Sequence, residues 1–240
     1  MNRVAIITDL HIKQNGLAYR TDTENNFYDL VAELKGWELD HIICAGDLSA
    51  KEALREDCIM VKTELDDLGV PYDVIRGNHD NALDISEVFG YEMQGGEVYF
   101  TKRVGDRSYI FLDTNEGTIS DQQCEWLELQ LQKPEEPFIV MHYPPMDSGI
   151  AYIDAKHEFK EPEKLLDILT GVGKRLNIFC GHCHSERLIQ YKNLSVFITP
   201  SCIAQVDERD TNFKMYHDYV GYRIIEDNGR SLRTFVKYLF

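Results

Sequence analysis

The chain has 240 residues and a formal net charge of −16, from 25 lysines and arginines against 41 aspartates and glutamates. A chain of this length can bury a substantial core and is expected to form one domain over residues 1–240. Because the net charge is negative and the sequence has no basic stripe, we expect no nucleic-acid polymer as a partner. No apolar run reaches the roughly 18 residues that a membrane span needs, so no membrane partner is expected, and the oligomeric state stays open.

The N-terminal sequence contains only a short apolar run, residues 4–7, which is too brief for the apolar centre of a secretory signal. We therefore expect a cytoplasmic protein in a reducing compartment. Its cysteines are then expected to be core thiols rather than disulfide partners. There are six of them: Cys44, Cys58, Cys124, Cys180, Cys183 and Cys202.

Along most of the chain, short apolar runs rich in β-branched residues alternate with longer helical patterns. Near-continuous apolar runs are typical of buried strands. They predict strands at residues 4–8, 41–45, 72–76, 98–103, 108–113, 138–142 and 177–180. Helical periodicity predicts helices at residues 23–35, 51–68, 121–132 and 161–169, and Gly95-Gly96 predicts a turn into a hairpin.

From Leu188 onward the pattern becomes all-β, with the segments RLIQY, SVFITP, YVGYRII and RTFVKYLF and a turn at Asp227-Asn228-Gly229. The first half is thus a β–α alternation, to which the second half adds antiparallel strands. This order predicts an α/β fold in which two sheets pack face to face with helices outside.

Polar side chains directly follow five of the predicted strands. Because open α/β sheets bind ligands at the carboxyl edge of their strands, these side chains are expected to converge in space. In three cases a glycine, Gly46, Gly77 or Gly181, comes between the strand and the polar residue, where it permits a sharp exit from the strand and close backbone approach. A turn, a cap or a core position explains each residue alone, but not the whole set. The set comprises Asp9, His11, Asp47, Asn78, His79, Asp80, His142, His182 and His184.

Seven members of this set carry oxygen or nitrogen donors suited to metal ions: Asp9, His11, Asp47, Asn78, His142, His182 and His184. If Asp47 bridges, two metal ions receive four protein ligands each. Mixed imidazole and oxygen ligation suits divalent or trivalent Mn, Fe or Zn. Two divalent ions, two aspartates and a bridging hydroxide leave a net charge of about +1 at the centre, which suits an anionic phosphate.

The motifs D-x-H, G-D, G-N-H-D, H and G-H-x-H together resemble the signature of the calcineurin-like metallophosphoesterases. The segments FLDTNEG, QQCEWLELQL, VMHYPP, ITPSCIAQ and GYRII are similar to those of the bacterial class III cyclic-nucleotide phosphodiesterases, so nearly the whole chain is covered. The resemblance implies a four-layer αββα sandwich of two mixed sheets, with a dinuclear metal site at the carboxyl edge of the strands.

The resemblance also implies roles for the residues. Asp9, His11, Asp47 and His184 would hold one metal, and Asp47, Asn78, His142 and His182 the other. A hydroxide that bridges the metals would hydrolyse a small phosphodiester of the cyclic-nucleotide type. His79 would protonate the leaving oxygen, and Asp80 would orient the ring of His79. Some branches that cleave pyrophosphates carry arginine in place of this histidine, so His79 favours ester hydrolysis.

Other functions stay open beside this one. A phosphomonoesterase or a glycerophosphodiester hydrolase is the main alternative, since these enzymes differ mainly in the loops over the metals. A non-enzymatic binding module is disfavoured because no ligand is missing. The CGHCH segment, residues 180–184, also matches the haem-attachment pattern C-x-x-C-H. That interpretation leaves the other four strand ends unexplained, so we expect Cys180 in the core and Cys183 pointing away from its histidine neighbours.

Several further segments are candidates for the rim of the site. Residues 143–157 form the best candidate for a loop over the substrate, in which His157 would reach the phosphate or base or would lie at the surface. Asn115 is either a rim residue or part of an Asx turn. The aromatic tract 211–222 would form a rim, a dimer contact or packing against the sheet. His41 begins a strand, at the wrong end for the site, and receives no role.

Overall fold

The computed structural model describes residues 1–14, 16–51, 53–216 and 219–239. Its first sheet has five strands in the order β13-β12-β1-β2-β3. Strands β1, β2 and β3 are parallel, whereas β12 is antiparallel to both β1 and β13. The strands are β1 (Asn2–Ile7), β2 (His41–Ala45), β3 (Tyr72–Ile75), β12 (Val220–Asp227) and β13 (Leu232–Leu239).

The second sheet has six strands in the order β4-β5-β6-β7-β9-β8. The four central strands are parallel and the two edge strands are antiparallel to their neighbours, so this sheet is also mixed. The strands are β4 (Phe100–Val104), β5 (Arg107–Phe111), β6 (Phe138–Val140), β7 (Leu176–Cys180), β8 (Arg187–Tyr191) and β9 (Leu194–Ile198).

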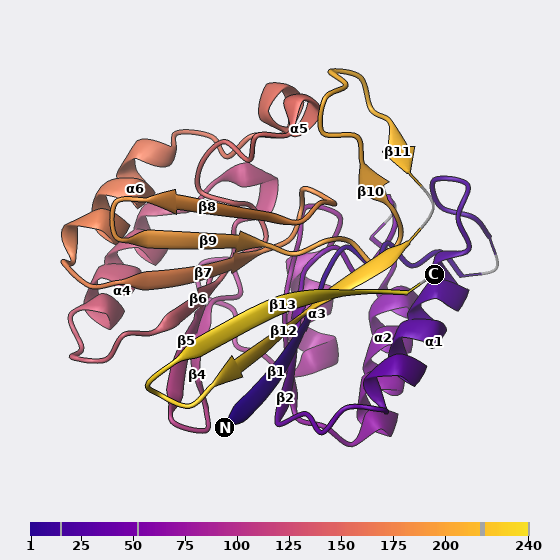
Figure 1. The fold of residues 1–240 in the computed structure, drawn as a ribbon, viewed down its shortest axis with the longest axis horizontal. Helices are drawn as coiled ribbons and strands as arrows, with labels where there is room; N and C mark the ends of the chain where they lie inside the picture. The colour runs from indigo at the N-terminus through magenta and orange to yellow at the C-terminus, as the bar shows by residue number, and fades with distance from the viewer. Residues whose placement is uncertain (15, 52, 217–218, 240) are drawn as a thin grey trace.

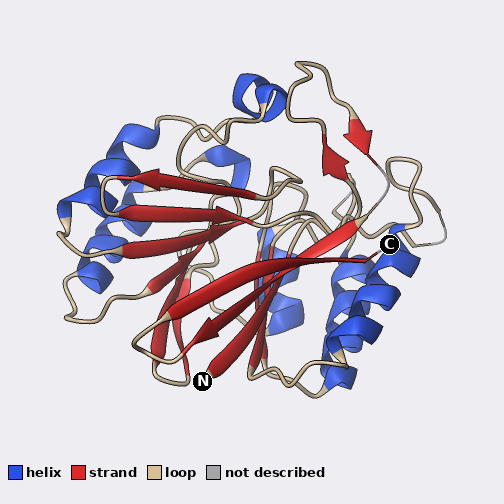
Figure 2. Cartoon of the chain, in the orientation of Figure 1, coloured by secondary structure: helices blue, strands red, loops and turns tan. Residues whose placement is uncertain are grey.

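Helices cover the outer face of each sheet, with α4 and α6 on the left and α1 and α2 on the right of the view (Figure 1). A short helix, α5, and the two-stranded ribbon β10–β11 stand at the top, above the sheets (Figures 1 and 2). These elements are α1 (Thr23–Leu34), α2 (Arg55–Leu68), α3 (Ala82–Phe89), the 3-10 turn η1 (Asn115–Gly117), α4 (Asp121–Leu131), α5 (Ala151–Lys156), α6 (Pro162–Gly171), β10 (Gln205–Val206) and β11 (Met215–Tyr216).

Three apolar cores hold the layers together. In β1, Ala5 and Ile7 pack toward the helices of the first sheet, whereas Val4 and Ile6 pack between the two sheets. A third core lies under the helices of the second sheet. Burial on both faces explains why the strands read as continuous apolar runs. The layers confirm the predicted αββα sandwich of two mixed sheets.

The predicted strands before residue 181 all form, and their ends differ from the prediction by only a few residues. The helix predicted at 51–68 begins only at Arg55, because Ala53 has a positive φ of 47° that no helix contains. The turn at Gly95-Gly96 closes a single bridge between Gln94 and Glu97 rather than a hairpin. The last part of the chain is not all antiparallel, since β9 pairs in parallel with β7.

Two helices and the β10–β11 ribbon are absent from the sequence prediction. A signal for α3 exists, because the Asn81 side chain accepts hydrogen bonds from the amides of Leu83 and Asp84 as a helix N-cap. The six cysteines are all buried and unpaired, which confirms them as core thiols. None of the described helices is long and apolar enough to cross a membrane.

Candidate metal centre

The site forms where the carboxyl ends of strands from both sheets meet. The loop after β1 bonds to the loop after β2, since the Asp9 amide donates to the Gly46 carbonyl (2.9 Å) and the His11 amide to the Asp47 carbonyl (3.0 Å). The same loop reaches the second sheet, because the His182 amide donates to both carboxylate oxygens of Asp9 at 3.2 and 3.0 Å. Loops far apart in sequence are therefore joined directly.

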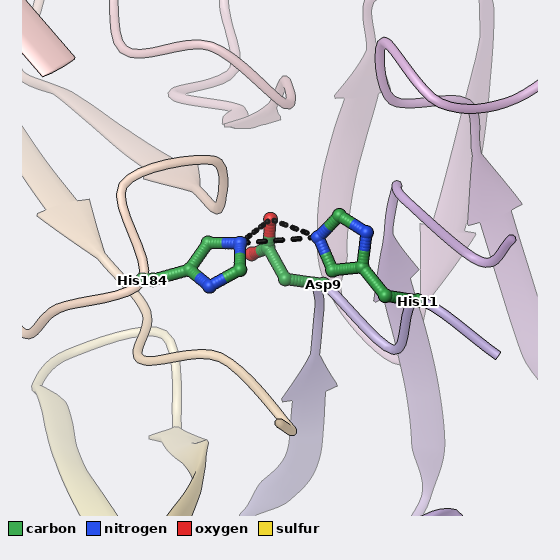
Figure 3. A group of neighbouring side chains, drawn as sticks. All are labelled: Asp9, His11 and His184. Atoms are coloured by element: carbon green, nitrogen blue, oxygen red, sulfur yellow. Dashed lines mark hydrogen bonds and ion pairs between the residues drawn. The ribbon is translucent and has the colours of Figure 1, made fainter. Parts of the chain in front are cut away.

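One group of ligand atoms comes from Asp9, His11 and His184, whose donor atoms lie within 4.8 Å of one another (Figure 3). Nε2 of His184 lies 3.3 Å from Oδ1 of Asp9, and the Nε2 atoms of His11 and His184 face each other at 3.1 Å. At that distance at most one of the two nitrogens can carry a proton. The arrangement suits two imidazoles that share a cation with a carboxylate.

A second group contains Asp9, Asp47 and His142, also within 4.8 Å. Nε2 of His142 lies 3.3 Å from Oδ2 of Asp47, and Nε2 of His11 lies 3.6 Å from the same oxygen. The carboxylates of both aspartates thus lie between imidazole rings. A carboxylate that bridges two metal ions requires such a position.

Asn78 and His182 contact each other at the side of these groups. Oδ1 of Asn78 lies 3.0 Å from Nδ1 of His182, and the ring of His182 is centred 5.2 Å from that of His142. The ring of Tyr143 stacks on His182 with centroids 3.7 Å apart. The structure thus brings all seven predicted ligands to one edge, with five in the two tight groups and these two beside them.

Backbone carbonyls set the orientation of three of the histidines. The carbonyl of Ala45 accepts from Nδ1 of His142 (2.8 Å), that of Ala204 from Nδ1 of His184 (3.2 Å) and that of His157 from Nε2 of His182 (2.9 Å). Such bonds turn the opposite ring nitrogen toward a metal. Sequence reasoning did not find these carbonyls, because a backbone acceptor has no residue-type signal.

Two buried nitrogens of the cluster make no hydrogen bond within the described part of the chain, Nδ1 of His11 and Nε2 of His142. A buried polar atom without a partner is costly. For Nε2 of His142, which lies 3.9 Å from Oδ1 of Asp9 and 3.3 Å from Oδ2 of Asp47, a cation would supply the partner. The donor set and this nitrogen therefore fit bound metal ions.

Protonation states favour metal binding at most of the ligands. Burial lowers the pKa of His11 and of His182 to about 3, so both rings are neutral near pH 7. Burial raises the pKa of Asp9, but His184 and His142 outweigh it and bring the pKa down to about 2. The pKa of Asp47 is likewise held well below its usual value, since His142 and His11 outweigh burial. Carboxylates and neutral imidazoles are the forms that bind cations.

The backbone at the ligands is strained. Asp9 (φ 54°), His11 (42°), Asp47 (55°), His182 (67°) and His184 (47°) all lie in the left-handed region, which non-glycine residues rarely adopt. Such conformations persist only where surrounding contacts enforce them, and they cluster at functional sites. The loop-to-loop hydrogen bonds provide that enforcement here.

The three glycines that follow the strands are needed for close approach, as predicted. A Cβ at Gly77 would lie 2.2 Å from Oδ1 of Asp47, and one at Gly181 would lie 2.0 Å from Oγ1 of Thr8. Gly46 has a φ of +97°, and a Cβ there would lie 2.7 Å from Nδ1 of His142. Any side chain at these positions would displace a ligand or the strand end that carries one.

His79 lies inside the cluster. Its amide donates to Oδ1 of Asp47 at 2.8 Å, and its ring is centred 4.8 Å from that of His11. His11, Asp47 and His79 also form a group whose ligand atoms lie within 4.8 Å. The imidazole is thus next to the ligands and partly accessible.

Asp80 does not orient His79, contrary to the prediction. Its buried carboxylate accepts hydrogen bonds from the amides of Leu48 (2.9 Å), Ser49 (3.1 Å) and Gly77 (2.8 Å). The bonds from Leu48 and Ser49 clamp the loop after β2 to the loop after β3, and the bond from Gly77 lies within the loop after β3. Burial, and then the charge of Asp47, raise the pKa of Asp80 to about 7. Asp80 therefore supports the loops and is not available to the ring.

The structure also places the predicted rim residues. The carbonyl of His157 accepts the hydrogen bond of His182. The ring of His157 is centred 6.3 Å from that of His182 and bonds the Tyr152 hydroxyl at 3.0 Å. The amide of Asn115 donates to Oδ1 of Asp113 at 3.3 Å, so the turn there is built on Asp113. His41 pairs with Asp73 at 2.9 Å, away from the ligands.

Cys180 and Cys183 lie in the core beneath the second sheet's helices, as expected. Both residues are fully buried and belong to the apolar core of the second sheet. Within the CGHCH segment the two histidines therefore face the site and the two cysteines face the core. This geometry does not present the cysteines for haem attachment.

Substitution of Gly77 tests the close approach. In Gly77→Ala, the new Cβ would push the Asp47 carboxylate away, and we expect metal binding to weaken roughly 10- to 100-fold, the range for residues that support metal ligands. The matched control is Gly171→Ala, because a Cβ there meets nothing within 4 Å. Metal content after dialysis, measured by mass spectrometry, reports the result. Equal metal content in both variants would contradict the geometry.

Metal affinity should fall as the pH is lowered. Burial lowers the pKa of His142, but the negative charge of the nearby Asp47 carboxylate outweighs burial and raises the pKa to about 9. Below pH 9 a metal must therefore displace this proton, so affinity should drop about tenfold per pH unit between pH 8 and 6. Calorimetry of Mn²⁺ binding in two buffers of different ionisation enthalpy would show about one proton released at pH 7. Affinity independent of pH would refute the assignment.

Comparison with solved structures supports the fold. A dimetal phosphatase from Danio rerio matches with a TM-score of 0.67 at 15% identity, covering 93% of this chain and 94% of that one. The purple acid phosphatase PPD1 from yellow lupin matches with a TM-score of 0.73 at 14% identity, covering 99% of this chain and 51% of that one. At these identities the likeness concerns the fold alone.

Comparison with curated proteins gives nearer relatives. A protein of Fibrobacter succinogenes named as a probable cyclic nucleotide phosphodiesterase is 30% identical over 228 residues, covering 93% of this chain and 89% of the relative. The 3′,5′-cyclic adenosine monophosphate phosphodiesterase CpdA of Escherichia coli K12 is 23% identical over 93% of this chain and 84% of its own length. A probable glycerophosphodiester phosphodiesterase of Arcobacter nitrofigilis is 29% identical over 85% of this chain and 79% of its own length.

The family assignment rests on the sequence and the site together. The family model described as calcineurin-like phosphoesterase matches residues 2–186, a range that contains all seven candidate metal ligands and His79. These are the residues that the fold gathers at the carboxyl edge of its two sheets. The chain belongs to the calcineurin-like phosphoesterase family.

Proposed function

We propose that this protein is a metal-dependent hydrolase of small phosphodiesters, most suitably of the cyclic-nucleotide type. The observation that carries the proposal is the convergence of two carboxylates and three imidazoles within the two tight groups of ligand atoms. A site of this kind is built to hold cations and, through them, an anionic ester. Support for the diester comes from relatives named as cyclic nucleotide phosphodiesterases.

In this proposal Asp47 is shared between two metal ions of Mn, Fe or Zn. When bound, the ions would polarise the phosphate oxygens and lower the pKa of a bound water. Asp9 and Asp47 are ionised and His11 and His182 are neutral at pH 7, so these four ligands would bind the ions without a change of protonation, whereas His142 would first lose a proton. One ion would be held by Asp9, His11, Asp47 and His184, and the other by Asp47, Asn78, His142 and His182.

His79 acts on the leaving group in this proposal. Its amide is fixed to Asp47 and its ring lies beside His11, so the imidazole stands next to the ligands without being buried among them. From there it donates a proton to the leaving alkoxide of the ester. Tyr143 has a supporting part, because its stacked ring keeps His182 in place.

A glycerophosphodiester hydrolase is the second candidate, favoured by the relative of that name at 29% identity. Both candidates cleave a phosphodiester and use the same centre, so they differ in what surrounds it. A cytoplasmic location belongs to the proposal as well, and it is supported by the six buried, unpaired cysteines. A small phosphate ester is the proposed partner.

Turnover assays test the function directly. Metal-stripped protein should hydrolyse bis(p-nitrophenyl) phosphate once Mn²⁺ is added back, and should prefer it to p-nitrophenyl phosphate. Asp47→Ala removes the shared carboxylate and should abolish turnover, while Gly171→Ala should behave as the unsubstituted protein. Preference for the monoester would instead identify a phosphomonoesterase. If the metal-loaded protein hydrolysed neither ester, the proposed hydrolase activity would be refuted.

Substitution of His79 tests its role as a proton donor. In His79→Ala, kcat for a diester with an alkoxide leaving group should fall roughly 10²- to 10⁴-fold. For a p-nitrophenyl ester the fall should be much smaller, because p-nitrophenolate leaves without a proton. Metal content, measured in parallel, separates this role from loss of a ligand. An equal loss on both esters would argue against proton donation.

A further inference from the structure

An array of aromatic rings lies along the candidate metal centre, and its members come from three separate segments. Tyr19 lies in the loop before α1, Tyr152 in α5 and Phe213 in the loop between β10 and β11. The ring of Phe213 is centred 5.8 Å from that of Tyr19 and 5.3 Å from that of Tyr152. We call these three residues the aromatic platform.

The platform is connected to the ligands at both ends. At one end the ring of Tyr19 contacts that of His11 edge-on, with centroids 5.4 Å apart. At the other end the Tyr152 hydroxyl bonds Nε2 of His157 at 3.0 Å, and the carbonyl of His157 accepts the hydrogen bond of His182. The array therefore extends from a ligand of one proposed metal to a ligand of the other.

Tyr19 lies in a tight turn, in a backbone conformation that is unfavourable for its side chain. Ala18 and Thr21 exchange backbone hydrogen bonds of 3.1 and 2.8 Å, and the two residues between them have positive φ, 52° at Tyr19 and 67° at Arg20. A left-handed conformation is rare for a bulky aromatic residue. Strain of this kind clusters where a side chain has a task.

Phe213 is the member that is open to a ligand. It keeps 46% of its surface exposed, although its ring contacts those of both Tyr19 and Tyr152. The β10–β11 loop that carries it is tied to α5, since the Ala151 amide donates to the Glu208 carbonyl at 3.1 Å. In Figure 1 this loop and α5 stand side by side above the sheets. The exposed ring is therefore held in a defined position, because its loop is fixed to α5.

The chemistry of these residues indicates what they bind. Three aromatic faces offer stacking and apolar contact, which suits a flat, unsaturated group and gives little to a flexible polyol. On a chain with a formal net charge of −16, such contacts attract a substrate without depending on charge. The phosphate itself belongs to the metal centre, so the group that meets the rings is the one attached to the phosphate.

We propose that Tyr19, Tyr152 and Phe213 bind the planar group of a phosphate ester and so give the enzyme a preference for nucleoside or aryl esters over glycerol esters. This inference rests on the proposed function, and it deepens it by separating the two diester candidates. It assigns specificity to the aromatic residues and leaves the chemical step to the centre.

Equilibrium binding tests the platform without turnover. The probes are adenosine 5′-monophosphate and glycerol 3-phosphate, which carry the same phosphate and differ in the attached group. Calorimetry on the Mn²⁺-loaded full chain should show adenosine monophosphate binding about tenfold more tightly, as expected for stacking of one base. Equal binding of the two probes would overturn the proposal.

Variants assign the preference to the rings. Phe213→Ala and Phe213→Leu should both bring the ratio of the two dissociation constants close to one, because leucine keeps apolar area but no ring. Phe213→Tyr and Tyr152→Phe keep the rings and should keep the ratio. The matched control is Tyr191→Ala on β8, another exposed aromatic residue, at 41% exposure, which should also keep it. A ratio that survives Phe213→Ala would refute the platform.

Hydrolysis separates this inference from the proposed function. The ratio of kcat/KM for 3′,5′-cyclic adenosine monophosphate to that for glycerophosphoethanolamine should fall about tenfold in Phe213→Ala, through KM. Diester hydrolysis with no such ratio would refute the platform and retain the function. Probe binding that depends on Phe213 in a protein without esterase activity would refute the function and retain the platform.

Discussion

The carboxylate of Asp9 is the contact on which the centre depends. Asp9 follows a strand of the first sheet, and His182 follows a strand of the second. The Asp9 carboxylate accepts a hydrogen bond from the His182 amide and lies within ion-pair distance of His184 and His142. No backbone ladder joins the two sheets within the described residues. An apolar core packs between them, and side chains such as Arg223 and Arg107 form hydrogen bonds from one sheet to the other. The Asp9–His182 contact therefore aligns two halves of a polar site that the apolar core alone would not position.

The same need explains the strain around it. Five of the candidate ligands have left-handed backbones, and three glycines leave no room for a side chain. Asp80 helps to hold them, since its contacts with the amides of Leu48 and Ser49 tie the loop of Asp47 to the loop of Asn78. A rigid, strained edge keeps ligand atoms close even though like charges oppose it, and bound cations would relieve that repulsion.

The residues around the centre come from other segments than the candidate ligands. The ligands lie in the loops that follow the strands, whereas α5, the β10–β11 loop and the turn at Tyr19 provide aromatic side chains around them. In a family whose members share one centre, such peripheral segments are where substrate preference can change without loss of chemistry. Relatives of this chain are named for different phosphodiesters, and the proposed role of the aromatic residues is to distinguish such substrates.

The sequence alone determined the αββα layering and the seven candidate ligands, because buried strands read as apolar runs and each ligand directly follows one. It did not predict α5, the β10–β11 ribbon or the parallel pairing of β9, since these depend on contacts with distant segments rather than on local periodicity. It also misassigned Asp80, whose neighbours in space are the amides of another loop. Only the tertiary structure decided which backbone carbonyls orient the histidines and that the rings of Tyr19, Tyr152 and Phe213 lie together. Neither feature leaves a pattern along the chain.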